Sequence, residues 1–257
     1  MTNDLVSVIM PSFNCGRFVE ETIRSVQAQT YQNWEIIFMD DCSTDDTIRR
    51  VSSMREKDPR IHLYQNVANS GAAVSRNNAL REAKGRWIAF LDSDDLWYPE
   101  KLEKQIEFME KNSFHFSCTG HNFIDEGGKP IGLYQTSPFH INKRKMFDYC
   151  WIGALTAMYD ANVIGLIQIA DIKKNNDYAI WLKAIQKADC FCIDECLGSY
   201  RVRRGSISRQ SKIKLIKWHY KLFREAEGMN VFQSTVHTIR NMFWGVIKKI
   251  KYVKSVN

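Results

Sequence analysis

The sequence predicts an α/β protein in which helices cover a mostly parallel central sheet. Through the first hundred residues, short apolar runs alternate with segments whose apolar residues recur at helical spacing. The runs expected to form buried strands are residues 6–10, 34–39, 61–64 and 87–91. The segments expected to form helices are residues 17–29, 48–54, 72–84 and 99–111. Each strand is followed by a helix, which is the order that builds a parallel sheet.

Residues at the boundaries support this division. Pro11 ends the first apolar run, because proline has no backbone N–H for a strand ladder. The first helix has one apolar face, formed by Val19, Ile23 and Val26. Gly85 follows the third helix, where glycine commonly ends helices, and Pro99 suits the first turn of the fourth.

The pattern loosens beyond residue 114. We expect a strand at 114–119, and a turn at 125–128 joining strands at 122–124 and 131–134. Residues 136–170 give no clear assignment. A helix is expected at 176–187, and short strands at 191–193 and 198–202.

The charges are divided unevenly along the chain. The 257 residues carry a net charge of +7, with 44% hydrophobic and 25% charged residues, a composition that disfavours wholesale disorder. Residues 201–257 hold 14 basic and two acidic side chains, whereas residues 1–200 hold 22 basic and 27 acidic ones. We therefore expect one domain over residues 1–210 and a basic, amphipathic helical extension over 211–257, facing an anionic partner.

The extension carries a continuous apolar stripe at spacings of four and three residues. Its members are Phe232, Val236, Ile239, Phe243, Val246, Ile250 and Val253. Two interpretations stay open. The stripe packs on the protein body or joins two copies in a homodimer, or it lies on an anionic membrane with the lysines near residue 250 beside the headgroups.

Other features of the sequence indicate a cytoplasmic protein, held peripherally at the inner face of the cytoplasmic membrane if the second interpretation is right. The first residues lack a basic and apolar signal pattern. No apolar run approaches the roughly 20 residues of a membrane span. Seven scattered cysteines suit reduced thiols, and we expect those at 190, 192 and 196 to lie in paired strands rather than in a metal site.

Polar clusters follow three of the predicted strands. They are residues 11–14, 40–41 and 92–95, the last reading Asp-Ser-Asp-Asp. Because ligands bind beyond the carboxyl ends of parallel strands, we expect these clusters to share one rim. Aspartates two apart suit Mn²⁺ or Mg²⁺, which complete their coordination with phosphate and water. The other interpretation is that such acids form turns and helix caps, which we prefer for Asp45 and Asp46.

The sequence lacks the motifs of several other classes of enzyme and binding protein. There is no glycine-rich dinucleotide loop after the first strand, no Walker-type loop and no nucleophile elbow. A nucleic-acid-binding protein would explain the basic tail but not the carboxylates, which repel phosphates unless a metal is present. A metal-dependent nucleotidyltransferase would need a glycine-rich, lysine-bearing loop near the N-terminus, and none is found. We therefore expect metal-assisted handling of a diphosphate.

A set of motifs in order resembles family 2 of the inverting glycosyltransferases, which have a single-domain, Rossmann-like glycosyltransferase-A fold. The matching stretches are residues 6–14, 40–47, 69–71, 75–77, 90–95, 176–182 and 200–203. The resemblance covers about residues 5–210. It extends to enzymes of bacterial surface-polysaccharide and O-antigen assembly, which implies a UDP-hexose donor and a lipid-diphosphate-linked sugar acceptor.

The resemblance also implies roles for individual residues. Those implied to bind the donor are Pro11, Phe13, Asn14, Asp41, Arg76, Asp92, Ser93 and Arg203. Pro11 and Phe13 would flank the base and Asp41 would accept from the uracil imide. Asp92 would approach the ribose, and Asp94 would bind the Mn²⁺ or Mg²⁺ that bridges the diphosphate.

Asp177 corresponds to the catalytic base of the family, the single carboxylate that an inverting displacement needs. An alternative is that Asp177 only opens a helix, where an acid is favourable. Two positions depart from the family pattern. Asn176 stands where the family usually has Glu, and Arg203 stands where it has His.

Overall fold

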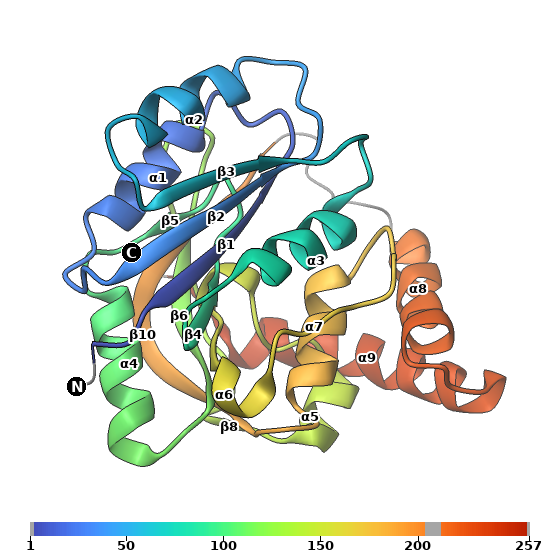
Figure 1. The fold of residues 1–257 in the computed structure, drawn as a ribbon. Helices are drawn as coiled ribbons and strands as arrows, with labels where there is room; N and C mark the ends of the chain where they lie inside the picture. The colour runs from blue at the N-terminus through green and yellow to red at the C-terminus, as the bar shows by residue number, and fades with distance from the viewer. Residues whose placement is uncertain (1–2, 204–211, 256–257) are drawn as a thin grey trace.

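The computed structural model describes residues 3–203 and 212–255, which form one central sheet covered by helices on both faces (Figure 1). The strands are β1 (Val6–Ser12), β2 (Trp34–Asp40), β3 (Ile61–Gln65), β4 (Trp87–Phe90), β5 (Leu96–Trp97), β6 (Phe116–Ile124), β7 (Pro130–Gln135), β8 (His140–Ile141), β9 (Met158–Asp160), β10 (Cys190–Arg201) and β11 (Val253–Ser255). The α-helices are α1 (Val19–Gln27), α2 (Thr47–Arg55), α3 (Ala72–Glu82), α4 (Lys101–Asn112), α5 (Lys143–Asp148), α6 (Ala161–Ile164), α7 (Asn176–Ala184), α8 (Lys212–Lys221) and α9 (Val231–Lys251). A 3₁₀ turn covers Ala154–Thr156, and a π-helical segment covers Leu222–Ala226.

The predicted parallel sheet is confirmed for the first four long strands. They lie in the order β3-β2-β1-β4, and all three pairings are parallel. Ile9 of β1 pairs with Ile37 on one side and Phe90 on the other. This register brings the carboxyl ends of β1, β2 and β4 to one edge.

The second half of the sheet is mixed. Antiparallel pairings join β4 to β9, β9 to β6, β6 to β7 and β7 to β11. β10 runs parallel to β6 and antiparallel to β5 and β8. The strands expected at 191–193 and 198–202 are parts of this one long, irregular strand, and its cysteines lie in strand pairing as expected.

Two apolar cores lie on opposite faces of the sheet. One packs α1, α2 and α4 against alternate residues such as Val8 and Phe38. The other packs α3, α5 and α7 against Ile9, Ile37 and Phe90. Alternation along each strand therefore fills both layers, as expected of a sheet buried on both sides.

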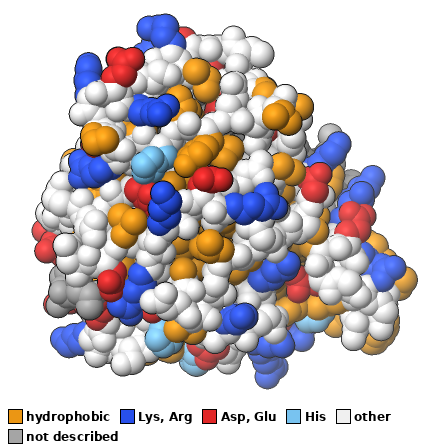
Figure 2. All heavy atoms as spheres, in the orientation of Figure 1, with side chains coloured by type: hydrophobic (Ala, Val, Ile, Leu, Met, Phe, Trp, Pro, Cys, Tyr) orange, Lys and Arg blue, Asp and Glu red, His pale blue; other side chains and the backbone are white. Residues whose placement is uncertain are grey.

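The C-terminal part of the chain packs on the body through α9. The apolar stripe is not the packing face: its members Phe232, Ile239, Phe243 and Ile250 are 60–77% exposed. The face turned to the body is polar, with Ser234, Thr238, Asn241 and Lys248 buried. Figure 2 shows hydrophobic side chains exposed beside basic and acidic ones at the right of the molecule, where α8 lies. The predicted boundary at residue 210 lies outside the described residues, and β11 completes the edge of the central sheet.

Candidate active site

The three polar clusters gather at one rim, as the sequence predicts. Ser12, the last residue of β1, pairs with Asp40, the last residue of β2, and the backbone N–H of Asp41 donates to the Ser12 carbonyl at 2.8 Å. β4 ends at Phe90, so Asp92 and Asp94 follow at the same edge. The parallel register therefore brings residues separated by 80 positions side by side.

Asp41 is buried and holds the loop that leads into α3. One carboxylate oxygen accepts from the Asn66 amide at 2.7 Å and from the Ser70 N–H at 2.8 Å. The other accepts from the Gly71 N–H at 2.7 Å. Gly71 has φ +86°, a conformation that favours glycine, directly before α3 begins. Three of about four acceptor directions of the carboxylate are thus used within the protein.

The loop after β1 is tied to the loop after β2. Asn14, in the left-handed region at φ 50°, accepts from the Thr44 N–H through its side chain, and its own N–H donates to Ser43 Oγ, both at 2.8 Å. Pro11 is buried, whereas Phe13 is 46% exposed. Phe13 therefore presents an exposed aromatic ring directly after β1, suited to stacking on a planar ring.

Arg76 joins the donor side of the rim to the helix that carries Asp177. Its buried guanidinium donates from one terminal nitrogen to Asp92 and from the other to the side-chain oxygen of Asn176. Asn176 opens α7, and Asp177 is its second residue. Arg76 thus fixes the position of the first turn of α7 relative to the end of β4.

Asp94 sits in a crowded, mainly buried environment. Burial raises the pKa of its carboxyl to about 6, and the neighbouring Asp92 charge adds to the rise, while Arg203 opposes it. The Arg203 Nε lies 2.5 Å from Asp94 Oδ2. Ser93, which lies between Asp92 and Asp94 in the sequence, is buried. Its side chain forms a hydrogen bond with the Cys15 thiol, which links this loop to the loop after β1.

Arg201 and Asp95 are buried and support the loop that carries Asp94, although the sequence motifs did not assign either residue to the site. The backbone N–H of Arg201 donates to Asp95 at 2.8 Å, and its Nε donates to the Asp94 carbonyl at 2.7 Å. Its Nη2 reaches Glu21 at 2.7 Å. Burial raises the pKa of Asp95 well above its usual value, and the charges of Asp94 and Asp92 add to the rise. The available signal was the position of both residues inside the motifs at 92–95 and 200–203.

Asp177 is partly exposed at the N-terminal end of α7. Its Oδ1 accepts from the Tyr178 N–H at 2.8 Å. Burial raises the pKa of the carboxyl and the Asp92 charge raises it further, while the Arg76 charge lowers it. A carboxylate with a raised pKa accepts a proton more readily than an ordinary surface aspartate.

The donor set at this rim suits a hard divalent cation. Among residues 3–203 and 212–255, no group of three or more His, Cys, Asp or Glu converges as a ready-made cage. Mg²⁺ and Mn²⁺ are commonly held by one or two carboxylates together with substrate phosphates. Asp94 offers such a carboxylate, and a cation would relieve the repulsion from the neighbouring Asp92 charge that helps to raise the pKa of Asp94.

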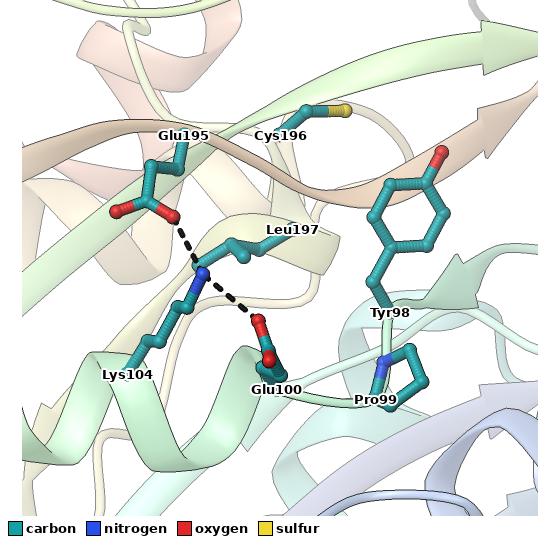
Figure 3. Close-up of a pocket in the computed structure, with 7 residues that line it drawn as sticks. All are labelled: Tyr98, Pro99, Glu100, Lys104, Glu195, Cys196 and Leu197. Atoms are coloured by element: carbon teal, nitrogen blue, oxygen red, sulfur yellow. Dashed lines mark hydrogen bonds and ion pairs between the residues drawn. The ribbon is translucent and has the colours of Figure 1, made fainter.

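A separate pocket lies between α4 and β10 (Figure 3). Lys104 bridges Glu100 and Glu195 there, at 2.9 Å to each. Tyr98, Pro99, Cys196 and Leu197 complete the lining, and none of the predicted site residues takes part. The carboxylate rim, rather than this pocket, carries the candidate chemistry.

Comparison with known proteins identifies the family. The model of glycosyl transferase family 2 matches residues 7–161. The chain belongs to this family. This glycosyltransferase is 41% identical over 238 residues to the putative teichuronic acid biosynthesis glycosyltransferase TuaG of Bacillus subtilis, covering 91% of this chain and 94% of TuaG.

Two further comparisons refine the picture. The glycosyltransferase is 38% identical, over 84% of each chain, to WfgD of Escherichia coli, a UDP-Glc:alpha-D-GlcNAc-diphosphoundecaprenol beta-1,3-glucosyltransferase. S. aureus TarS, solved with UDP-GlcNAc, matches at a TM-score of 0.71 and 21% identity, over 96% of this chain and 76% of TarS. These matches confirm the predicted glycosyltransferase-A fold, with its α/β sheet and helical C-terminal extension.

Proposed function

We propose that this glycosyltransferase moves a hexose, with inversion, from a UDP-sugar to a hydroxyl of a lipid-diphosphate-linked sugar. The substrates named for WfgD support both parts of this proposal, and TuaG supports a place in surface-polysaccharide synthesis. The observation that carries the proposal is the bridge from Arg76 to Asp92 and Asn176, because it couples the donor rim to the helix of the candidate base. The proposed catalytic domain covers residues 1–210.

The donor would lie along the rim. Phe13 stacks on the uracil ring with Pro11 beneath it, and Asp41 uses its remaining acceptor direction for the imide N–H. Asp92 approaches the ribose, while the loop residues Asn14 and Ser93 shape the floor. Arg203 is placed to move from Asp94 to the diphosphate once a cation compensates that carboxylate.

A divalent cation, Mn²⁺ or Mg²⁺, would be held by Asp94 and the donor diphosphate. When bound, it supplies charge stabilisation for the departing nucleoside diphosphate. A mannosyltransferase of the same fold from Pyrobaculum calidifontis, solved with GDP-Man and Mn²⁺, supports the use of such an ion (TM-score 0.68, 16% identity).

Asp177 would act as the general base. It takes the proton from the acceptor hydroxyl while that oxygen bonds to the anomeric carbon, and the bond from this carbon to the diphosphate oxygen breaks. One displacement of this kind inverts the anomeric configuration and needs no protein nucleophile. The raised pKa of Asp177 supports this role.

The outward face of α9 would hold the enzyme on an anionic membrane, at the inner face of the cytoplasmic membrane. Exposed Phe232, Ile239, Phe243 and Ile250 supply apolar area, and Lys249, Lys251 and Lys254 are exposed beside them. Among the described residues no helix has the length and apolar character needed to span a bilayer. An acceptor carried on a lipid would favour an enzyme kept at that surface.

A donor screen tests this function. The full chain is incubated with UDP-glucose, UDP-galactose, UDP-GlcNAc or GDP-mannose and a short-chain lipid-diphosphate-GlcNAc acceptor, with Mn²⁺, Mg²⁺ or EDTA. We expect a disaccharide product from a UDP-hexose, a metal requirement, and inversion by NMR. Pyrophosphate release would indicate the nucleotidyltransferase alternative, and tight, salt-sensitive RNA or DNA binding without transfer would indicate a nucleic-acid-binding protein.

A further inference from the structure

Three arginines surround the ring of Phe18, a residue that lies directly before α1 and is 7% exposed. The guanidinium carbons of Arg17, Arg201 and Arg203 lie 5.1, 5.0 and 5.5 Å from the centroid of this ring. A guanidinium within about 6 Å of an aromatic centroid is attracted to the face of the ring. Phe18 therefore stabilises a group of three cations between the start of α1 and the end of β10.

The three cations have partners of different kinds. Arg17 is largely exposed and pairs with Glu126 at 3.0 Å. Arg201 is buried and binds oxygens of the protein that keep the neighbouring loops in place. Arg203 instead places its Nε 2.5 Å from Oδ2 of Asp94, the carboxylate proposed to bind the divalent cation. Arg203 is thus the member of this group whose partner is the proposed metal ligand.

The chemistry of Arg203 sets it against a metal ion at Asp94. A guanidinium has no acceptor atom and keeps its charge at every pH relevant to proteins, so it cannot coordinate a metal and repels one. A neutral imidazole, which the family pattern would place at position 203, can coordinate a metal. The exchange of His for Arg therefore replaces a possible ligand by a cation that already binds an oxygen of Asp94.

The protein alone offers a divalent cation few other ligands. In the part of the chain that the structure describes, no three His, Cys, Asp or Glu side chains come together as a metal site. Mg²⁺ and Mn²⁺ commonly complete their coordination with the phosphate oxygens of a substrate. A diphosphate at this rim would supply such oxygens, and it would also give Arg203 another anionic partner, because a guanidinium binds phosphate through paired hydrogen bonds.

We propose that Arg203 is the counter-ion of Asp94 in the free enzyme, and that it makes metal binding depend on the diphosphate of the donor. Without donor, Arg203 neutralises Asp94 and opposes binding of a divalent cation. When the donor binds, Arg203 exchanges Asp94 for the diphosphate and the cation takes its place at Asp94. This inference rests on the proposed metal site at Asp94.

The test measures Mn²⁺ binding to the full chain without donor, by the electron paramagnetic resonance signal of free Mn²⁺ at pH 8. Arg203→Met should bind Mn²⁺ about tenfold more tightly than the wild type, because the competing charged hydrogen bond is gone. Arg203→His should bind at least as tightly as Arg203→Met, since imidazole can add a ligand. The control Arg17→Met removes a cation from the same ring but not from Asp94, and it should bind Mn²⁺ as the wild type does.

The same titrations with saturating UDP measure the coupling between the two ligands. UDP should strengthen Mn²⁺ binding by a larger factor in the wild type than in Arg203→Met, in which no competitor has to leave Asp94. By linkage, Mn²⁺ should strengthen UDP binding by the same factor in each protein. This factor is a property of binding alone and does not depend on transfer.

Two results would overturn the inference. One is equal Mn²⁺ affinity of the wild type and Arg203→Met without UDP, even if the enzyme transfers sugar as proposed. The other is equal tightening in Arg17→Met and Arg203→Met, which would show a general effect of positive charge. Absence of transfer from every UDP-sugar, with the difference at Arg203 intact, would instead overturn the proposed function and leave the role of Arg203 in metal binding supported.

Discussion

Arg76 donates a hydrogen bond to Asn176, the residue before the proposed base, across 100 positions of sequence. The same guanidinium binds Asp92 at the end of β4, so α3 connects two parts of the site that the sequence leaves far apart. The family usually has Glu at position 176. Asparagine keeps a side-chain oxygen that accepts from Arg76. It also avoids a second carboxylate beside Asp177, whose negative charge would raise the pKa of Asp177 further.

Arg76→Lys should lower kcat/KM by about 10–100-fold. Lysine keeps the charge but cannot make the two directed bonds of the guanidinium, and a hydrogen bond to a charged group contributes about 1.5–3 kcal/mol. Arg81→Lys, an exposed change on the same helix, is the control and should be neutral. Equal kinetics of the two variants would show that the bridge plays no part in transfer.

Asp94→Ala should abolish metal-dependent UDP binding while the fold is retained. The motivation is the position of Asp94 beyond β4, in an environment that already disfavours two adjacent charges. Calorimetry with UDP, with and without Mn²⁺, measures the effect. Asp171→Ala, an exposed aspartate, is the control. Unchanged Mn²⁺-dependent affinity in Asp94→Ala would assign the metal to another residue.

Asp177→Asn should bind donor normally and lose turnover by on the order of 10²–10⁴, the usual contribution of a positioned base. The substitution preserves size and the acceptor oxygen for the Tyr178 N–H, so folding should be little affected. Single-turnover transfer and UDP affinity are the two measurements. Near-normal transfer would mean that another carboxylate takes the proton.

Acidification should destabilise the protein through His121, which is 4% exposed. Burial lowers the pKa of His121 to about 3, and the Lys248 charge lowers it further. The unfolded chain therefore binds the proton first, so this contribution to stability is complete above pH 6.5 and is lost as the pH falls toward 3. Between pH 7 and pH 5 the loss amounts to about 2 kcal/mol.

Urea unfolding of the wild type and of His121→Phe at pH 7 and pH 5 measures this loss of unfolding free energy. Phenylalanine suits the aromatic surroundings, since Phe123 and Tyr200 lie against the ring. The difference in unfolding free energy between pH 7 and pH 5 should be smaller in the variant by about 2 kcal/mol. An identical pH dependence would mean that His121 is protonated in the folded protein at pH 5.

The sequence predicts the parts of the fold that local patterns determine. The strands from β1 to β4 were recognisable because each is a mainly apolar run, although β1 does not end at Pro11 as expected but continues to Ser12. Residues 136–170 were not, because their elements are short and owe their form to distant partners. The three-residue β9, for example, pairs with both β4 and β6.

The site was predicted as a set of residues but not as a network. The motifs put Asp41 at a strand end, but nothing local reveals that its carboxylate already binds the N–H groups of Ser70 and Gly71. The buried role of Arg201 was equally hidden, since arginine is usually exposed. For α9, the apolar stripe was clear, yet its direction depends on polar contacts such as that of Asn241 with Tyr178.

The exposed stripe of α9 leads to the last prediction, which is tested by substitution of surface side chains rather than by deletion of residues 231–257. Deletion would remove buried Lys248 and strand β11 as well as the stripe, so its result could not be interpreted. The quadruple change of Phe232, Ile239, Phe243 and Ile250 to Ser alters only side chains at least 60% exposed. It should release the protein from anionic vesicles at low salt while transfer to the short-chain acceptor is retained.

Co-sedimentation with phosphatidylglycerol-containing vesicles measures membrane binding. The difference from binding to neutral vesicles gives the electrostatic contribution to that binding. Changing Lys249, Lys251 and Lys254 to Gln should weaken binding to anionic vesicles alone, because each base near such a surface contributes about 1 kcal/mol. Sedimentation velocity tests the alternative that a second copy of the chain covers the stripe in a homodimer. A wild-type dimer that the serine changes dissociate, together with absence of vesicle binding, would assign the face to a second copy of the chain and overturn the membrane role.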